Sequence, residues 1–149
     1  MENDYNNLIK SIKAIIDKNC SLVGNLSNIA SFIYHNISDL NWVGYYLIEG
    51  SNLVLNTFQG KPACNIIKLY NGVCGHAVKE RKTIIVPNVL EFENHIVCDA
   101  DSKSEIVVPI WKNNCIIGVL DIDSNIINRF NEKEKAFFEE VVRIVETLF

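Results

Sequence analysis

Apolar residues recur at helical spacing in the N-terminal part of the chain. One set lies between residues 8 and 16, and a second set lies between residues 22 and 37. Intervals of three and four residues place such side chains on one face of a helix. The pattern therefore predicts two consecutive amphipathic helices. Their apolar positions are Leu8, Ile9, Ile12, Ile15 and Ile16 in the first, and Leu22, Leu26, Ile29, Ile33 and Ile37 in the second.

The chain then changes to short runs of β-branched and aromatic residues, which are typical of strands. Residues 42–58 contain two such runs around a turn at 50–52, and this pattern predicts a hairpin. A second hairpin is predicted over residues 105–123, around a turn at 112–114.

The segment between the two hairpins is less regular. Residues 64–70 and 83–87 each predict a short strand, and residues 71–81 predict a glycine turn that opens a brief helix. Residues 87–104 are long and mostly irregular, which is typical of a functional loop in a compact domain. A last helix is predicted from about Asn131, with Glu134 in the position of a capping box.

This order of elements predicts an α+β fold. We expect a single domain over residues 1–149, with a helical lead-in at 1–40 and the sheet, pocket loops and C-terminal helix at 41–149. An antiparallel sheet is expected to carry the N- and C-terminal helices on one face. Loops around residues 60–75 and 87–104 are expected to form a pocket on the other face.

Composition narrows the classes of function. The chain has 149 residues, 48% hydrophobic residues and a net charge of −4. An acidic chain without a basic stripe argues against nucleic-acid binding. The sequence contains no run of 18 apolar residues, so we expect no membrane span. The N-terminus is acidic and rich in amides, unlike a secretory signal. We therefore expect a cytoplasmic protein.

The five cysteines are an odd number, which argues against a secreted disulfide scaffold. Cys20, in a helix connection, and Cys115, at a strand edge, fit structural or incidental roles. Cys64, Cys74 and Cys98 are predicted in loops, where proximity to a helix N-terminus or a cation lowers a thiol pKa. Their spacings of 10 and 24 residues lack a close CxxC pair, so we expect no metal site.

Acidic residues gather at one end of the second hairpin. Asp121 and Asp123 are two residues apart on a strand, so their side chains share a face. A three-residue turn would place Trp111 opposite Cys115 and Glu105 opposite Asp121. Like charges at such positions need a cation, a shared proton or a ligand. A solvated strand end is the alternative, but the apolar residues that lead into these acids favour a pocket.

Trp42, Gly44 and Tyr46 share one face of the first strand. Two aromatic rings around a glycine can bound a slot for an ammonium group or a sulfur atom. Ordinary core packing is the alternative, and on these residues alone it is favoured.

The three histidines give weaker signals. His35 is predicted on a surface helix face. His76 and His95 lie near Cys74 and Cys98 in sequence and could tune a thiol, but solvated loop histidines are the favoured interpretation.

Several ordered motifs complete the picture. Six motifs follow one another from about residue 41 to the C-terminus: NWVGYYL, QGKPAC, NGVCGHA, NHIVCDADSKSEIVVPI, IGVLDIDS and RFNEKE. In this order and spacing they closely resemble the free methionine-(R)-sulfoxide reductases, which are GAF-domain enzymes acting on the free amino acid. The first forty residues match only as a helical lead-in. The resemblance implies that the single domain over residues 1–149 is GAF-like.

The resemblance implies a role for each candidate residue. Cys98 matches the catalytic cysteine, Cys64 the usual resolving cysteine, and Cys74 a third cysteine that is an alternative resolver or relay. The residues implied to bind the substrate and line its pocket are Trp42, Tyr46, Glu105, Asp121 and Asp123.

The implied activity is thiol-dependent reduction of free L-methionine (R)-S-oxide to L-methionine. It proceeds through a cysteine sulfenic acid and an intramolecular disulfide that thioredoxin resets, without a cofactor. The alternative from another class is a non-catalytic GAF-type sensor of a small ligand or of redox state, with a Cys64–Cys98 disulfide as its switch. The oligomeric state stays open, with a homodimer among the alternatives.

Overall fold

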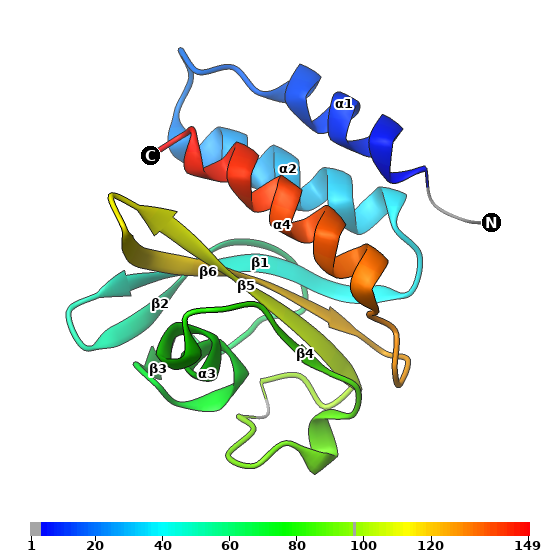
Figure 1. Ribbon diagram of the computed structural model, residues 1–149, viewed down its shortest axis with the longest axis vertical. Coiled ribbons are helices and arrows are strands. Elements are labelled where there is room, and N and C mark those ends of the chain that lie inside the picture. The colour runs from blue at the N-terminus through cyan, green and yellow to red at the C-terminus, as the bar shows by residue number, and fades with distance from the viewer. Residues whose placement is uncertain (1–3, 97) are drawn as a thin grey trace.

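The computed structural model describes residues 4–96 and 98–149 and shows a six-stranded sheet between a helical layer and a layer of loops (Figure 1). The elements, in chain order, are α1 (Tyr5–Ile15), α2 (Leu22–Asn36), β1 (Leu40–Glu49), β2 (Asn52–Gly60), β3 (Ile66–Lys68), α3 (Gly72–Glu80), β4 (Ile84–Val86), the 3-10 turn η1 (Val89–Glu91), β5 (Ser104–Lys112), β6 (Cys115–Ser124) and α4 (Glu132–Glu146).

All strand pairs in the sheet are antiparallel, and the strand order is β3-β2-β1-β6-β5-β4. The two predicted hairpins, β1–β2 and β5–β6, meet through the β1–β6 pair at the centre of the sheet. The predicted α+β fold, with an antiparallel sheet and helices on one face, is confirmed. None of the described helices is both long and apolar enough to cross a bilayer.

The helical layer contains α1, α2 and α4, with α1 outermost in Figure 1. The α2 and α4 helices pack on the sheet, whereas α1 packs on those two helices. The predicted capping box of α4 is present, because the Asn131 side chain accepts from the Lys133 amide and Glu134 accepts from the Asn131 amide. These bonds satisfy amides at the first turn of α4 that have no partner within the helix.

The central strands alternate strictly between the two layers. Side chains facing the helices are apolar and fully or almost fully buried, and they form one core with α2 and α4. This period of two is what a strand imposes on successive side chains. The helix-facing residues are Val43 and Tyr45 on β1, Ile106, Val108 and Ile110 on β5, and Leu120 and Ile122 on β6.

The second hairpin differs from its predicted register. Its turn has two residues, Asn113 and Asn114, both with positive φ, as a tight hairpin turn requires. Trp111 pairs with Ile116 after an irregularity in β5, and Glu105 pairs with Asp123. The predicted pairs of Trp111 with Cys115 and of Glu105 with Asp121 are therefore wrong. The shift at the acids is two residues, so the carboxyl groups keep their common face.

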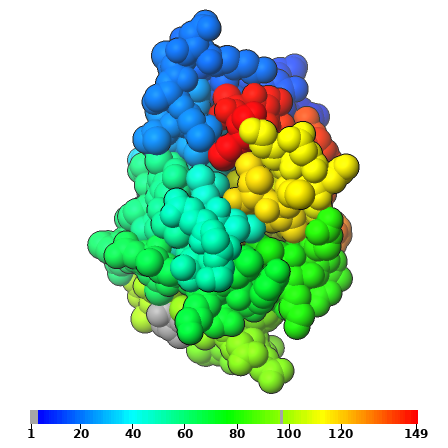
Figure 2. Space-filling view, turned by 90° about the vertical axis from the view of Figure 1, so that its left-hand side faces the viewer, coloured from blue at the N-terminus to red at the C-terminus, as the bar shows by residue number. Residues whose placement is uncertain are grey.

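The other face of the sheet carries α3 and the segment 87–103 between β4 and β5, called the lid loop below. A side view shows these segments, in green and yellow-green, at the end of the molecule opposite the blue and red helices (Figure 2). A second, smaller apolar cluster joins α3 to this face of the sheet. As predicted, the described residues of the lid loop, 87–96 and 98–103, are irregular apart from η1.

Candidate active site

A small cavity of about 40 Å³ lies between the sheet and the lid loop. Its walls come from β1, β3, β5, β6, α3, the β2–β3 loop and the lid loop, and they contain all the predicted site residues except Cys64. The structure thus brings together residues that are far apart in the chain. The predicted residues in its wall are Trp42, Tyr46, Cys74, Cys98, Glu105, Asp121 and Asp123.

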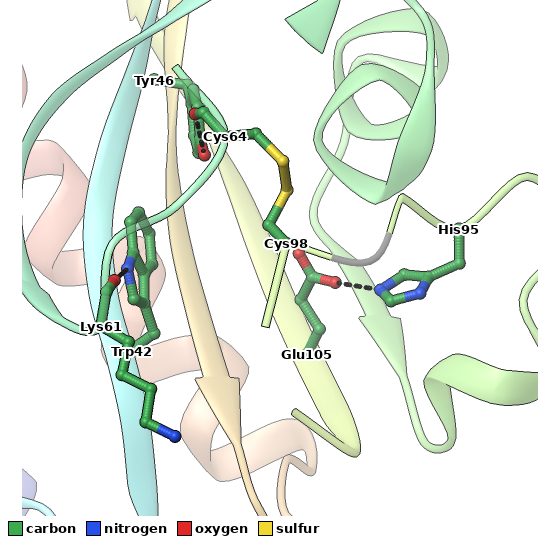
Figure 3. Close-up of a disulfide and its surroundings, with 7 residues drawn as sticks. All are labelled: Trp42, Tyr46, Lys61, Cys64, His95, Cys98 and Glu105. Atoms are coloured by element: carbon green, nitrogen blue, oxygen red, sulfur yellow. Dashed lines mark hydrogen bonds and ion pairs between the residues drawn. A yellow bond between two sulfur atoms is a disulfide. The ribbon is translucent and has the colours of Figure 1, made fainter. Parts of the chain in front are cut away.

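A disulfide between Cys64 and Cys98 closes one side of this cavity (Figure 3). The two Cα atoms are 5.5 Å apart, and 34 residues separate the cysteines in sequence. Cys64 lies in the loop between β2 and β3, and Cys98 lies in the lid loop. The bond therefore connects the lid loop to the sheet. Cys20 and Cys115, for which structural or incidental roles were predicted, form no disulfide and are exposed.

Two aromatic residues of β1 contact the loop between β2 and β3 that carries Cys64, called the Cys64 loop below. The Trp42 indole donates to the Lys61 carbonyl at 3.1 Å, and the Tyr46 hydroxyl donates to the Cys64 carbonyl at 2.9 Å. The two rings stack with centroids 6.0 Å apart. Gly44 between them makes room for the indole, since a Cβ there would lie 2.5 Å from Trp42 Cη2. Packing alone does not explain these polar contacts with the cysteine loop.

Polar contacts also connect the lid loop to its surroundings. The Asn41 amide donates to Asp99 at 3.2 Å and to Ser102 at 3.0 Å. Lys61 pairs with Asp101, which joins the Cys64 loop to the lid loop at an exposed position. An exposed pair of this kind contributes little to stability. Asn41 is therefore the better anchor of the lid loop.

Three carboxyl groups form the floor of the cavity. Glu105 lies directly opposite Asp123 in the β5–β6 ladder, and Asp121 lies two residues before Asp123 on β6, on the same face. Glu105 and Asp121 are buried, and Asp123 is partly buried. The Oδ1 atom of Asp121 has no hydrogen-bond partner among the described residues. The predicted acidic cluster is therefore a pocket feature and not a solvated strand end.

Burial dominates the electrostatics of this floor. Burial, together with the charge of the neighbouring carboxylates, raises the pKa of Glu105 and that of Asp123 well above the usual range. Burial also raises the pKa of Asp121, although hydrogen bonds with Glu105 and Cys74 oppose that shift. Like charges this close cannot all ionise. The floor therefore keeps at least one proton at pH values where isolated carboxyl groups are ionised.

Cys74 departs from its prediction. It lies in the first turn of α3, as expected, but it is buried and not in a loop. Burial first, and then the charges of Asp121, Glu105 and Asp123, raise the pKa of its thiol well above the usual value. The expected lowering of this pKa at a helix N-terminus is wrong, because desolvation and three nearby acids oppose the thiolate.

His95 is the site residue that sequence reasoning missed. It lines the cavity, and its Nε2 lies 3.8 Å from Glu105 Oε2 (Figure 3). Burial lowers the pKa of His95, which favours the neutral ring. The assignment as a solvated loop histidine is thus wrong for His95, and also for His76, which lies in α3 against Phe92. The only feature of the sequence that indicates a position of His95 in the cavity wall is its nearness to Cys98 in the same loop.

Comparison with known proteins agrees with this geometry. The model of the GAF domain family matches residues 19–148. The free methionine-R-sulfoxide reductase of Escherichia coli (strain K12) is 40% identical over 142 residues, which cover 95% of this chain and 86% of that protein.

Two solved structures have the same fold. The reduced form of fRMsr of Staphylococcus aureus matches with a TM-score of 0.93 and 46% identity, covering 97% of this chain and 94% of that chain. The free methionine-R-sulfoxide reductase of Neisseria meningitidis in complex with its substrate matches with a TM-score of 0.93 and 35% identity, covering 97% and 87%. The chain therefore belongs to the GAF domain family and, within it, to the free methionine-R-sulfoxide reductases.

Proposed function

We propose that this protein reduces free L-methionine (R)-S-oxide to L-methionine with Cys98 as its nucleophile. The observation that carries the proposal is the Cys64–Cys98 disulfide at a cavity floored by three carboxyl groups. Sulfoxide reduction needs a soft nucleophile for sulfur and an acid for oxygen, and this cavity places both in one space. The family relationship supports the same reaction.

In the proposed first step, the reduced Cys98 thiolate attacks the sulfoxide sulfur. A protonated carboxyl group of the floor donates to the sulfoxide oxygen, which ends on Cys98 as a sulfenic acid while methionine leaves. The sulfur of the substrate gains two electrons and Cys98 loses two, so the step is balanced. The raised pKa of Glu105 and that of Asp123 keep such a proton available near neutral pH.

The same floor accounts for a preference for the free amino acid. Its ionised carboxylates attract the α-ammonium group of the substrate, and Trp42 and Tyr46 offer aromatic walls to the rest of the molecule. A residue inside a peptide has no α-ammonium group, and its flanking chain would have to pass the lid loop. We therefore propose selection against protein-bound methionine sulfoxide.

In the proposed second step, the Cys64 thiol displaces hydroxide from the Cys98 sulfenic acid and forms the disulfide and water. The structure corresponds to this oxidised state. Cys74 is less suited to the step because burial raises the pKa of its thiol. A dithiol such as that of thioredoxin then reduces the disulfide by thiol–disulfide exchange, which suits a reducing compartment such as the cytoplasm.

The lid loop must move within this cycle. A cavity of about 40 Å³ has room for a few water molecules but not for methionine sulfoxide. Reduction of the Cys64–Cys98 bond removes the covalent connection between the lid loop and the sheet. We propose that this release opens the cavity to the substrate, and that closure afterwards keeps water from the sulfenic acid.

Turnover with purified substrates tests the proposal. Thioredoxin, its reductase and NADPH are supplied, and NADPH oxidation is followed with the free (R) epimer, the free (S) epimer and a peptide containing methionine sulfoxide. We expect turnover with the free (R) epimer alone. Absence of turnover with that epimer, while thioredoxin still reduces the disulfide, would contradict the enzyme assignment.

A redox switch is the second candidate, and the Cys64–Cys98 disulfide is the observation that favours it. In this case the disulfide forms in response to an oxidant and no substrate is turned over. Peroxide would oxidise the reduced protein to the disulfide form, and the (R) epimer would neither form that disulfide nor yield methionine. Disulfide formation by one equivalent of the (R) epimer excludes this candidate.

A further inference from the structure

We propose that the closed cavity binds one divalent zinc ion through the Cys74 thiolate and the carboxylates of Glu105 and Asp121. Ligand atoms of these three residues all lie within 4.8 Å of one another. No second group of this kind occurs among residues 4–96 and 98–149. The inference concerns the oxidised protein and does not depend on the reductase activity.

The donor atoms suit zinc. Thiolate sulfur and carboxylate oxygen are ordinary zinc ligands, at about 2.3 Å and about 2.0–2.2 Å from the metal. Tetrahedral coordination brings such ligands to about 3.5 Å from one another, so no pair of the three ligand atoms has to approach by more than roughly 1.3 Å. Three protein ligands leave a fourth position, and the cavity of about 40 Å³ accommodates water there.

Asp121 supplies an independent indication of a ligand. Asp121 is only 6% exposed and lines the cavity. It has hydrogen bonds with Glu105 and Cys74, but its Oδ1 atom has no hydrogen-bond partner among the residues that the structure describes. A buried acceptor without a partner carries a desolvation cost, which a cation in the cavity would offset.

Size separates this ligand from the amino acid. The closed cavity admits an ion with water but not methionine sulfoxide, so zinc and the disulfide coexist while the substrate and the disulfide do not. Zinc on Asp121 and Glu105 also occupies carboxylates that the proposed substrate needs. We therefore expect zinc to favour the closed, oxidised protein and to slow its return to the substrate-binding form.

The test uses oxidised protein, in which the disulfide removes Cys64 and Cys98 as competing ligands. Zinc binding is measured by equilibrium dialysis without substrate, and Co²⁺ replaces zinc to reveal a sulfur-to-metal charge-transfer band. We expect one zinc ion per chain and a cobalt–thiolate band. Cys74→Ser and Asp121→Asn should each weaken binding at least tenfold, and Cys74→Ser should abolish the band.

The control is the double variant Cys20→Ser with Cys115→Ser, which removes the exposed thiols and should bind zinc like the parent. Loss of binding in this control, unchanged binding in Cys74→Ser, or no binding by the parent would each overturn the zinc site. Circular dichroism and the intact disulfide confirm that each variant is folded. Reductase turnover in metal-free buffer is measured separately, so failure of the zinc site and failure of the proposed activity remain distinguishable.

Discussion

Tyr45 and Tyr46 are neighbours on β1, yet they belong to opposite faces of the sheet with opposite chemistry. Tyr45 is fully buried under the helices, and its hydroxyl has no hydrogen-bond partner among the described residues. Tyr46 faces the cavity, and its hydroxyl donates to the Cys64 carbonyl at 2.9 Å. One face uses an aromatic side chain for its volume, and the other uses it to hold a reactive loop.

The difference extends over both layers. On the helix face, regular elements bury apolar side chains in one continuous core. On the lid face, irregular segments cover three carboxyl groups and are held by one disulfide and a few polar bonds. We infer that the helix face provides most of the free energy of folding. The lid face contributes less, because it buries the carboxyl groups that the proposed reaction needs. Substitutions should therefore separate into those that lower stability and those that lower turnover.

The largest expected effect on turnover is at the lid face. Cys98→Ser removes the proposed nucleophile, so turnover with the free (R) epimer should fall to background in the thioredoxin-coupled assay. Cys115→Ser removes an exposed thiol at the turn of the second hairpin and should keep full turnover. Full turnover by Cys98→Ser would show that the role assigned to Cys98 is wrong.

The largest expected effect on stability is at the helix face. Phe138 of α4 is fully buried against Phe130 and Phe137. Phe138→Ala should lower the free energy of unfolding by about 3–5 kcal/mol, as measured by urea denaturation. Turnover per folded molecule should stay within about twofold at a temperature where the variant is folded, because the cavity lies on the other face. A large loss of turnover in the folded variant would contradict the claim that the helix face affects stability and not turnover.

A smaller effect concerns pH. Burial and the neighbouring carboxylates raise the pKa of Glu105, so the folded protein keeps a proton that the unfolded chain releases near pH ~4.3. The associated stabilisation is complete below about pH 4.3 and is lost as pH rises through the folded-state pKa. Glu105→Gln lacks this loss, so above neutral pH the oxidised variant should be more stable than the parent by on the order of 1 kcal/mol.

Urea denaturation of the oxidised protein across pH measures this difference. The matched control is Glu80→Gln, which changes an exposed glutamate at the end of α3 and should leave the pH dependence as it is in the parent. The same pH dependence in the parent and in Glu105→Gln would show that folding does not raise the pKa of Glu105.

The smallest effects come from the two tyrosines. Tyr45→Phe removes a buried hydroxyl without a described partner, so stability should stay the same or rise by up to about 1 kcal/mol. Tyr46→Phe removes the donor to the Cys64 carbonyl, so stability should fall by about 1 kcal/mol and turnover should fall as well. Thermal unfolding of both variants, with turnover as the second readout, compares the two faces at adjacent positions. Equal effects at the two positions would contradict the comparison.

Most of the fold could be predicted because local patterns and tertiary structure agree. The helical spacing of residues 8–37 and the common face predicted for Asp121 and Asp123 both agree with the layers of the structure. The register of the second hairpin could not be predicted, because it depends on the two-residue turn at Asn113 and Asn114 and on the irregularity at Trp111. The pairing partner of Glu105 moved by two residues, from Asp121 to Asp123, so the three acidic side chains still share one face of the sheet.

The site was predictable where side-chain identity was informative and less so where burial decides the chemistry. Motifs and spacing singled out Cys64 and Cys98, and their role assignments remain predictions. The pKa of Cys74 was predicted in the wrong direction, because the packing of α3 over the carboxyl groups is a tertiary feature that the residues around Cys74 do not encode. His95 was missed for the same reason, since only the fold turns it towards Glu105.

A single-turnover measurement on Cys64→Ser tests the proposed role of the lid face most directly. The reduced variant is mixed with free methionine (R)-sulfoxide, methionine is quantified, and the cysteine peptides are analysed by mass spectrometry. We expect one methionine per protein molecule, then a stall, with one added oxygen atom on the peptide that contains Cys98. No methionine, or an oxygen atom on the peptide of another cysteine with Cys98 unchanged, would contradict the proposed chemistry.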